Sequence, residues 1–332
     1  MVAVSYHDTV KFLQGTIAPR EDHLTGPFDR VEWFQLLAAG GISPLLVEAG
    51  HGGESLTLPL TRTDSGLEPL INWYSFIWRP MTRCDEHCAL LLRAAAKDLR
   101  RQSHRVTLWP LPDEDGTASR LEHAFHSAGW TVERSQCDHN HVLPVKGRSF
   151  AEYWASRPGP MRTTLKRKAK KVEVEILDHF EPAAWAAYEQ VYANSWKPEE
   201  GNPALLRQFA EAEGAAGRLR MGIARHEGLP VAAQFWTAEN STAYIHKLAH
   251  LEDYKALSAG TTLSAALFEH VIDRDRVDLV DFGTGNDPYK ADWMEVDRPR
   301  FRLDCLDKRQ FRAWPVLGRR VAGRVARAFQ QS

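Results

Sequence analysis

The 332-residue chain has no long apolar run, almost no net charge and few cysteines. No stretch approaches the roughly eighteen consecutive apolar residues of a membrane-spanning helix, which argues against an integral membrane protein. The first residues contain neither a basic segment nor an apolar core, so we expect no signal peptide. A formal net charge of −1 gives no overall field that would favour nucleic acid or an acidic membrane.

The four cysteines are too few for a disulfide scaffold in a chain of this length. We therefore expect a cytoplasmic protein with reduced thiols. Cys84 and Cys88 have the spacing of a possible metal pair, but no second Cys/His pair accompanies them. We expect two thiols buried on one face of a helix, and no metal site.

The length is that of two domains, and the composition is that of a globular protein. Each half shows an early helix, a central run of strands and a late strand–helix–strand unit, which suggests an internal repeat. Residues 130–145 are expected to form two strands around the polar tip 137–140. The expected segments are an extended lead-in (1–27), a first half (28–147), a second half (148–306) and a basic C-terminal helix (307–332).

The most informative segment is a strand followed by a small-residue loop and a helix. Strand-like residues Thr242–His250 precede the loop Lys255–Gly260, and a helical pattern follows over Thr261–Asp273. Amide groups at the start of a helix, aided by the helix dipole, bind phosphate groups. A second strand, Val277–Gly283, is followed by a polar turn that ends at Lys290. This order predicts a transferase whose donor carries a diphosphate.

The motif Lys255-x-x-Ser258-x-Gly260 resembles the Q/R-x-x-G-x-G/A signature of the GNAT acetyltransferases. With four further segments, the chain resembles the CelD-like acetyltransferase family and, more distantly, the FemAB peptidyltransferases, over roughly residues 148–306. The resemblance implies an α+β fold of two tandem GNAT-like mixed-sheet domains, with the working site mostly in the second. The further segments are Ser195–Lys197, Ala232–Gln234, Ile245–Ala249 and Asp281–Trp293.

The same resemblance implies an acyl-CoA co-substrate whose pantetheine arm lies between the two strands. For two of the residues assigned below to the acceptor, a core position is the alternative: His246, as a lone strand histidine with satisfied hydrogen bonds, and Trp196. By position, the arm would lie on Leu248, Ala249 and His250, and the pyrophosphate on Lys255, Ser258, Gly260, Thr261 and Thr262. The acceptor would face Trp196, Lys197, His246, Lys247 and Asp287.

Acyl transfer to an amine needs a base for the amine and an acid for the leaving thiolate. Asp281 is the candidate base, since it lies in an otherwise apolar strand; the alternative is a structural carboxylate that caps a turn or pairs with Lys247. Tyr289 is the candidate acid, and a packed tyrosine with a satisfied hydroxyl is its alternative. Lys290 would bind an anionic group of the acceptor or steady the donor.

We therefore expect an N-acyltransferase that moves an acyl group such as acetyl to a small or saccharide-linked amine. A link to exopolysaccharide production is commonly supposed for CelD-like relatives. Three alternatives stay open: an aminoacyl-tRNA-dependent peptidyltransferase, a non-catalytic acyl-CoA-binding module, and an acyl-carrier protein as donor. The second is favoured by Ser258–Ala259, where the family often shows Ser-Pro. No DNA partner is expected.

Two basic segments bear on partners. Residues 162–171 carry six Lys/Arg, which suit RNA, a carrier protein, an acidic acceptor or the donor's 3′-phosphate, or simply form a solvated face. Residues 308–332 carry seven Lys/Arg and an apolar stripe, formed by Phe311, Trp314, Val316, Leu317, Val321, Val325 and Phe329. That segment is expected to dock on the core, with peripheral membrane contact as the alternative.

Overall fold

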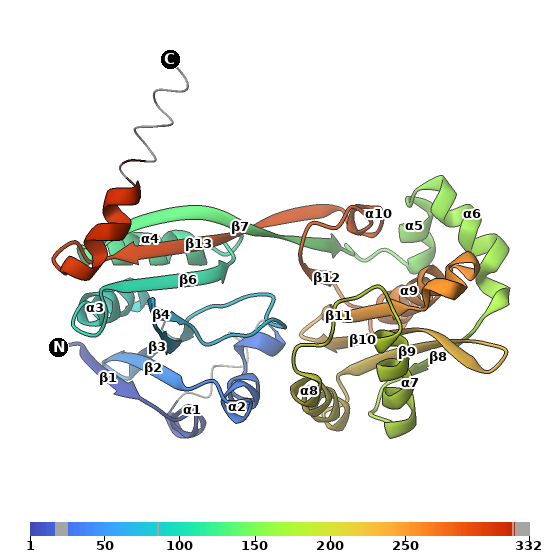
Figure 1. The fold of residues 1–332 in the computed structure, drawn as a ribbon, viewed down its shortest axis with the longest axis horizontal. Helices are drawn as coiled ribbons and strands as arrows, with labels where there is room; N and C mark the ends of the chain where they lie inside the picture. Colours follow the sequence, from blue (N-terminus) through green and yellow to red (C-terminus); the bar gives the residue numbers. More distant parts are fainter. Residues whose placement is uncertain (17–25, 85, 321, 323–332) are drawn as a thin grey trace, which may run out of the picture. The chain divides into compact units, whose positions relative to one another are not determined.

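The computed structural model describes residues 1–16, 26–84, 86–320 and 322, and the chain folds into two compact units. The first unit comprises Met1–Asp138 and the chain from Pro299 onward, and the second comprises His139–Arg298 (Figure 1). Strand β7 (Thr131–Pro144) leads from the first unit into the second, and β13 (Val296–Leu306) returns. The expected segments 28–147 and 148–306 omit this return of the chain.

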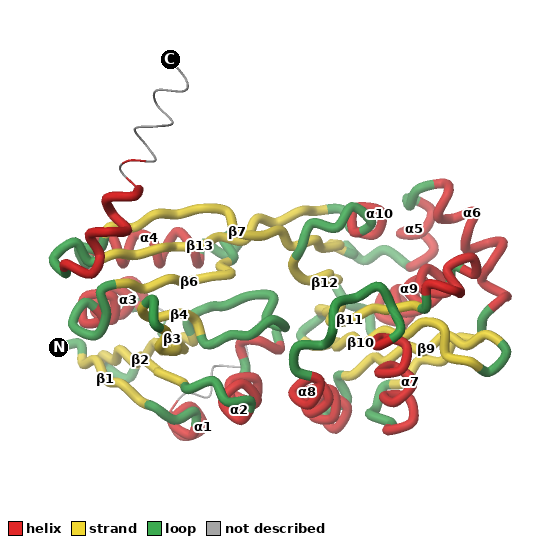
Figure 2. The backbone as a smooth tube through the Cα atoms, viewed as in Figure 1, coloured by secondary structure: helices red, strands yellow, loops and turns green. Residues whose placement is uncertain are grey.

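The first unit is a mixed sheet with helices, built on a long antiparallel meander (Figure 2). Its strand order is β1-β2-β3-β4-β6-β13-β7, and β5 pairs with β3. Helix α3 packs against the meander, and its apolar face supplies Leu91, Ala95 and Leu99 to the core. The remaining elements are β1 (Ala3–His7), α1 (Lys11–Thr16), η2 (Pro27–Asp29), α2 (Val31–Ala39), β2 (Pro44–His51), β3 (Glu54–Thr63), β4 (Gly66–Pro69), β5 (Met81–Arg83), α3 (Cys88–Leu99), β6 (Arg105–Leu111) and α4 (Thr117–Ser127).

The second unit repeats this order of a meander, a helix and a parallel strand. Its strand order is β7-β12-β11-β10-β9-β8. In both units a helix joins the meander to a strand that pairs in parallel with it, β4 with β6 and β11 with β12. Its elements are α5 (Phe150–Ala155), α6 (Gly159–Lys168), η3 (Ala169–Lys171), β8 (Glu173–Leu177), α7 (Pro182–Ala193), α8 (Pro203–Ala215), β9 (Leu219–His226), β10 (Leu229–Glu239), β11 (Thr242–His250), η4 (Glu252–Leu257), α9 (Ala259–Glu269), η5 (His270–Arg274), β12 (Leu279–Thr284) and α10 (Lys290–Trp293).

A glycine sets how closely α9 approaches the sheet of the second unit. A Cβ atom at Gly222 on β9 would lie 2.8 Å from Leu263 Cδ1 and 2.9 Å from Leu267 Cδ1. Real Cβ atoms do not approach carbon that closely, so the missing side chain lets α9 lie directly on β9. The helix that begins at the predicted phosphate loop is thereby fixed against the core.

The lead-in is more structured than the extended segment that we expected. Strand β1 pairs antiparallel with β2, and the Tyr6 hydroxyl donates a 2.7 Å hydrogen bond to Asp98 Oδ1. Leu13 of α1 is fully buried. Sheet pairing and burial, which weak local patterning does not reveal, order this segment. Residues 17–25 of the expected lead-in lie outside the described residues.

The prediction of two strands around a polar tip at residues 137–140 is wrong, because β7 runs unbroken from Thr131 to Pro144. The expected tip contains no glycine or proline to turn the chain, and its polarity has another cause. Asn140 is fully buried and uses its side chain to bond β12. A polar residue in a strand here marks a buried hydrogen bond and not a turn.

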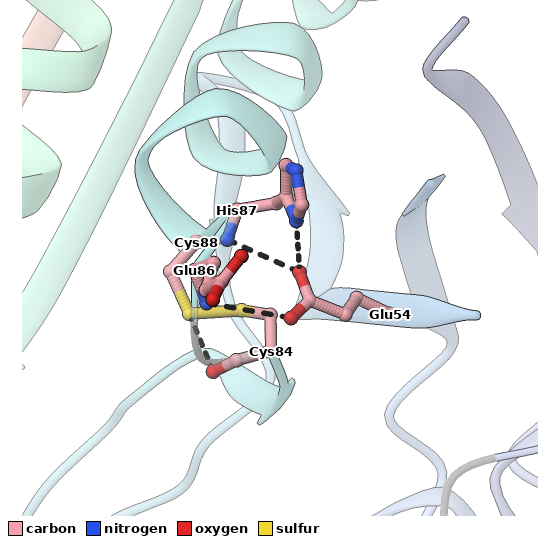
Figure 3. Close-up of a disulfide and its surroundings, with 5 residues drawn as sticks. All are labelled: Glu54, Cys84, Glu86, His87 and Cys88. Carbon is pink, nitrogen blue, oxygen red and sulfur yellow. Dashed lines mark hydrogen bonds and ion pairs between the residues drawn. A yellow bond between two sulfur atoms is a disulfide. The ribbon is translucent and has the colours of Figure 1, made fainter. Parts of the chain in front are cut away.

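The expectation of two reduced helix-face thiols is also wrong, since Cys84 and Cys88 form a disulfide with Cα atoms 5.3 Å apart. Helix α3 begins only at Cys88, so the first cysteine precedes the helix. Glu54 lies beside the bridge: its carboxylate accepts from the His87 amide at 3.1 Å and lies 2.8 Å from His87 Nδ1 (Figure 3). A spacing of four residues suits either a helix face or such a bridge, and sequence alone does not separate them.

The C-terminal segment begins with η6 (Phe311–Ala313) and a helix from Trp314. Arg320 pairs with Glu133 and Asp304 of the same unit. Phe311 and Trp314, part of the predicted apolar stripe, are 73% and 61% exposed. The stripe residues Val321, Val325 and Phe329 lie outside the described residues. Within the described part of the chain, no helix is long and apolar enough to cross a membrane.

Candidate functional site

The parallel strands β11 and β12 of the second unit pair over a short stretch and then separate. Among the described residues their ladder comprises three pairs, from Thr242 opposite Leu279 to Tyr244 opposite Asp281. The ladder between β10 and β11 changes register at His246, the bulged residue between Ile245 and Lys247. A bulge bends its strand and is common beside active sites. It accounts for the end of pairing, although β11 continues to His250.

The predicted phosphate loop has the geometry of an anion seat. Ser258 is the N-cap of α9 in a left-handed conformation with φ of 55°, and its side chain does not cap the helix. The first amide of the helix with a backbone acceptor is that of Thr262, which donates to the Ser258 carbonyl. Among the described residues, none accepts from the amides of residues 259–261. Amides of this kind at a helix N-terminus bind phosphate oxygens.

A buried glutamine of the sheet is hydrogen-bonded to the first turns of α9, where the amides of the seat lie. Gln234 on β10 is 1% exposed, and its Nε2 donates to Ser264 Oγ at 2.7 Å and to the Gly260 carbonyl at 3.3 Å. Its Oε1 accepts from Trp236 Nε1 at 2.9 Å. The resemblance singled out Ala232–Gln234 without a role, and the structure shows one: the amide ties the sheet to the first turn of α9.

The predicted donor residues lie along β11 and the loop. Leu248, Ala249 and His250 pair with Gln234, Ala233 and Ala232 of β10. Lys255 is exposed, and its Nζ lies 3.4 Å from Glu252 Oε2. Thr262 is 6% exposed and its hydroxyl has no hydrogen-bond partner among the described residues. Thr261 is half-buried at the third position of α9, two residues beyond the actual start of the helix.

His250 joins the seat to two of the predicted acceptor residues. Its Nδ1 would lie 3.4 Å from a Cβ at Gly260, and its ring centroid lies 4.2 Å from that of Trp196. The Lys197 ammonium lies 5.1 Å from the Trp196 ring centroid. Burial lowers the pKa of His250 and also that of Lys197, while the Asp287 carboxylate opposes the shift at Lys197. The fold therefore gathers these side chains from a helix end, a strand end and the polar turn.

Asp281 stands where β11 and β12 cease to pair. Its Oδ1 accepts from Asn140 Nδ2 at 2.6 Å and from the Gly283 amide at 2.7 Å. Gly283 has φ of 67°, a left-handed conformation that turns its amide toward the carboxylate. Oδ2 makes no hydrogen bond to a described residue and is not fully enclosed. One carboxylate oxygen is fixed, and the other is available to accept a proton.

Tyr289 and Lys290 follow on the polar turn and differ in their surroundings. Tyr289 is half-buried, and its ring packs edge-on against Phe282. Burial, and secondarily the Asp287 charge, raises the pKa of Tyr289, so its hydroxyl keeps its proton at neutral pH. Lys290 is 4% exposed, and its ammonium donates to the carbonyls of Thr284 and Gly285. This places Lys290 as a brace of the turn, and its role toward an acceptor stays a prediction.

His246 and Lys247 have protein partners. His246 Nε2 lies 2.8 Å from Thr237 Oγ1, and its ring stacks on Phe235. Lys247 Nζ donates to Glu200 Oε1 at 2.9 Å in a pair that is nearly buried. Burial lowers the pKa of Lys247, opposed by its bond to that carboxylate. Contact of either residue with an acceptor stays a prediction.

Three residues at the site were missed at the sequence level: Asn140, Glu200 and Lys168. Each acts on a residue far away in the chain, so no local pattern could have revealed it. The basic run 162–171 was noted, but not that Lys168 lies 3.2 Å from the Ser258 hydroxyl. In the described ranges, no group of three or more His, Cys, Asp and Glu side chains is arranged to hold a metal ion.

Residues 159–291 match the family model described as an acetyltransferase (GNAT) domain. This segment contains the separating strands, the loop and the polar turn described above. The second unit therefore carries a GNAT acetyltransferase domain. A search of curated proteins finds no match.

Solved structures share the fold over most of the chain. FemX aligns with a TM-score of 0.62 at 10% identity, over 92% of this chain and 98% of that one. A conserved protein of unknown function from Bacteroides thetaiotaomicron aligns with a TM-score of 0.59 at 13% identity, over 92% and 100%. The C-terminal domain of a putative lysylphosphatidylglycerol synthetase from Agrobacterium fabrum gives 0.56 at 12%, over 86% and 89%.

At such identities the likeness concerns the fold alone. The predicted α+β fold of two tandem GNAT-like domains is confirmed. The distant resemblance to FemAB proteins holds at the level of fold through FemX.

Proposed function

We propose that this protein is an N-acyltransferase that uses acyl-CoA, with acetyl as the simplest acyl group, and an amine of a small or saccharide-linked acceptor. The observation that carries the proposal is the position of Asp281. It lies at the last pair of the β11–β12 ladder, in the segment that matches the GNAT model. The seat formed by the amides of residues 259–261 lies at the start of the next helix.

The residues fit the donor that the family implies. Among the described residues, the amides of residues 259–261 and the Thr262 hydroxyl have no partner, which suits a pyrophosphate, and the strand edge beyond Tyr244 suits an amide-containing arm. Bound acyl-CoA would supply an activated thioester. The chain's own residues then bind the phosphates, align the arm along β11 and move two protons.

Asp281 takes the first proton. Its Oδ2 accepts a proton from the ammonium of the acceptor, while Asn140 and Gly283 hold Oδ1 and fix the orientation of the carboxylate. Tyr289 gives the second proton, from its hydroxyl to the leaving thiolate, and regains one from the nitrogen as the amide forms; its raised pKa keeps the hydroxyl protonated at neutral pH. The acceptor lies against Trp196 and Lys197, and the saccharide-linked class follows from the CelD-like resemblance.

Calorimetric titration with CoA and acetyl-CoA tests the proposal on the wild type, Gly260→Trp and Gly318→Trp. An indole at position 260 meets His250 and covers the amides, whereas a Cβ at Gly318, in the first unit, meets nothing within 4 Å. We expect a Kd of about 1 µM to 1 mM for the wild type and Gly318→Trp, and loss of binding in Gly260→Trp. A panel of amines then identifies the acceptor.

Absence of CoA binding by a folded wild type would refute the acyl-CoA donor. The second candidate is then aminoacyl-tRNA-dependent transfer, which the exposed basic face of α6 and η3 favours (Arg162, Lys166, Arg167, Lys170 and Lys171). CoA binding without turnover across the amine panel would indicate a binding module. We place the protein in the cytoplasm on the strength of the CoA donor, although the Cys84–Cys88 disulfide is more typical of oxidising compartments.

A further inference from the structure

Lys168 of the basic helix α6 lies on the helix face that packs against the core, whereas the neighbouring basic side chains are exposed. Met161 and Leu165 of α6 pack against the core of the second unit. Lys168 follows at the i+3 position from Leu165 and i+7 from Met161, on the same helix face. It is half-buried, whereas Lys166 and Arg167 are exposed. Lys168 therefore extends the inward face of α6, which packs against α9.

Lys168 ends at the phosphate loop. Its Nζ donates a 3.2 Å hydrogen bond to the hydroxyl of Ser258, the N-cap residue of α9. Within the described part of the chain, no carboxylate lies within 4 Å of this ammonium. The other pocket lysine, Lys247, has the carboxylate of Glu200 at 2.9 Å. Lys168 thus brings an uncompensated charge to the seat.

This arrangement places like charges together. The N-terminus of α9 carries partial positive charge, and the amides of residues 259–261 point out from it. An ammonium at the same place makes the local potential more positive, and the ammonium and the helix N-terminus repel each other. Such a combination becomes favourable when an anion lies between the two. The buried Thr262 hydroxyl in the same first turn, which has no partner among the residues that the structure describes, is a further group that an anion or its water would satisfy.

We propose that Lys168 binds the pyrophosphate of the acyl-CoA donor, as a cation supplied by α6 to the amide seat of α9. The proposal rests on the proposed function and names a residue for it. The pyrophosphate, rather than the 3′-phosphate of the adenosine, is the target because Ser258 joins Lys168 directly to the seat. The bond to Ser258 keeps the long side chain in position before the donor arrives.

Two ligands and two variants test this assignment. CoA carries both the pyrophosphate and the 3′-phosphate, and dephospho-CoA carries the pyrophosphate alone. Lys168→Met removes the charge and keeps an apolar stem, and Lys166→Met makes the same change on the exposed face of the same helix. Calorimetric affinities are measured for both ligands on wild type and both variants, with thermal unfolding as the check of folding.

Lys168→Met is expected to weaken both ligands by the same factor, about tenfold to hundredfold, as for a charge-assisted hydrogen bond. Lys166→Met is expected to change neither by more than about twofold, since an exposed charge contributes little. Weakening of CoA alone would show that Lys168 binds the 3′-phosphate and would overturn the assignment. So would unchanged binding of both ligands by Lys168→Met. Failure of the wild type to bind either ligand would instead reject the acyl-CoA donor, and this proposal with it.

Discussion

Replacement of Asp281 by asparagine separates the catalytic and structural interpretations of this residue. Asparagine has the same shape, so its amide oxygen can still accept from Asn140 Nδ2 and the Gly283 amide. A hydrogen bond to a charged group is worth about 1.5–3 kcal/mol and a neutral one about 0.5–1.5 kcal/mol. Two bonds that each weaken by about 1 kcal/mol lower the free energy of unfolding by about 2 kcal/mol.

The catalytic effect is expected to be much larger. The asparagine amide cannot accept the proton that we assign to Oδ2, and loss of a general base typically costs about 10²–10⁴-fold in rate. Affinity for CoA should change little, since the phosphate seat lies on another element. The measurements are urea unfolding, CoA calorimetry and the rate of thiol release from acetyl-CoA with the acceptor that the amine panel identifies.

The alanine variant provides the contrast. Asp281→Ala removes both bonds: the buried Gly283 amide loses its acceptor, and Asn140 Nδ2 loses its shortest bond but keeps the 3.2 Å bond to the Gly283 carbonyl, a loss of about 3–5 kcal/mol. The assignment of Asp281 as base would be refuted by an asparagine variant that retains at least a third of the wild-type rate. A loss of stability in Asp281→Asn as large as that in Asp281→Ala would contradict the hydrogen-bond geometry.

Three further predictions concern stability. Gln234→Leu is expected to lower the free energy of unfolding by about 3 kcal/mol in urea, because three hydrogen bonds, two of them buried, are lost and Trp236 Nε1 is left without its acceptor. A change under about 1 kcal/mol would contradict this. Burial lowers the pKa of His250 below its ordinary 6.5, so the unfolded chain binds the proton more readily than the folded one. The wild type should therefore lose more stability than His250→Gln as the pH falls below 6.5, and parallel stability profiles of the two proteins would exclude this effect of His250. Reduction of the Cys84–Cys88 bridge is expected to lower the free energy of unfolding by about 2 kcal/mol, which is the loop-closure entropy of so short a loop. Cys84→Ser is the control, since dithiothreitol should not lower its stability further.

Local patterns predicted the elements around the site well. The strand 242–250, the helix after the motif and the strand that contains Asp281 are all present, since each depends on periodicity. Of the predicted loop 255–260, only Ser258 lies outside a helix, because η4 ends at Leu257 and α9 begins at Ala259. The helix starts two residues earlier than predicted, at Ala259, because Ser258 adopts the left-handed conformation itself.

Predictions failed where a distant contact decided the local structure. Asn140 makes residues 137–140 look like a turn, but its polarity serves a bond to Asp281, 141 residues away. The first residues lack a clear pattern and still form a strand, because β2 offers an edge to pair with. The bridge between Cys84 and Cys88 depends on where α3 begins, which the cysteine spacing does not fix.

By itself, the sequence determined the α+β class, the order of the strands and helix around the site and the location of the predicted phosphate-binding motif, because these follow from periodicity, turn residues and short motifs. The tertiary structure alone decided the geometry that chemistry requires. It showed that β11 and β12 cease to pair at Asp281, that Gln234 supports the loop, and that Lys168 reaches Ser258 across 90 residues. Side-chain contacts between segments far apart in the chain leave no periodic trace, and the candidate site consists largely of such contacts.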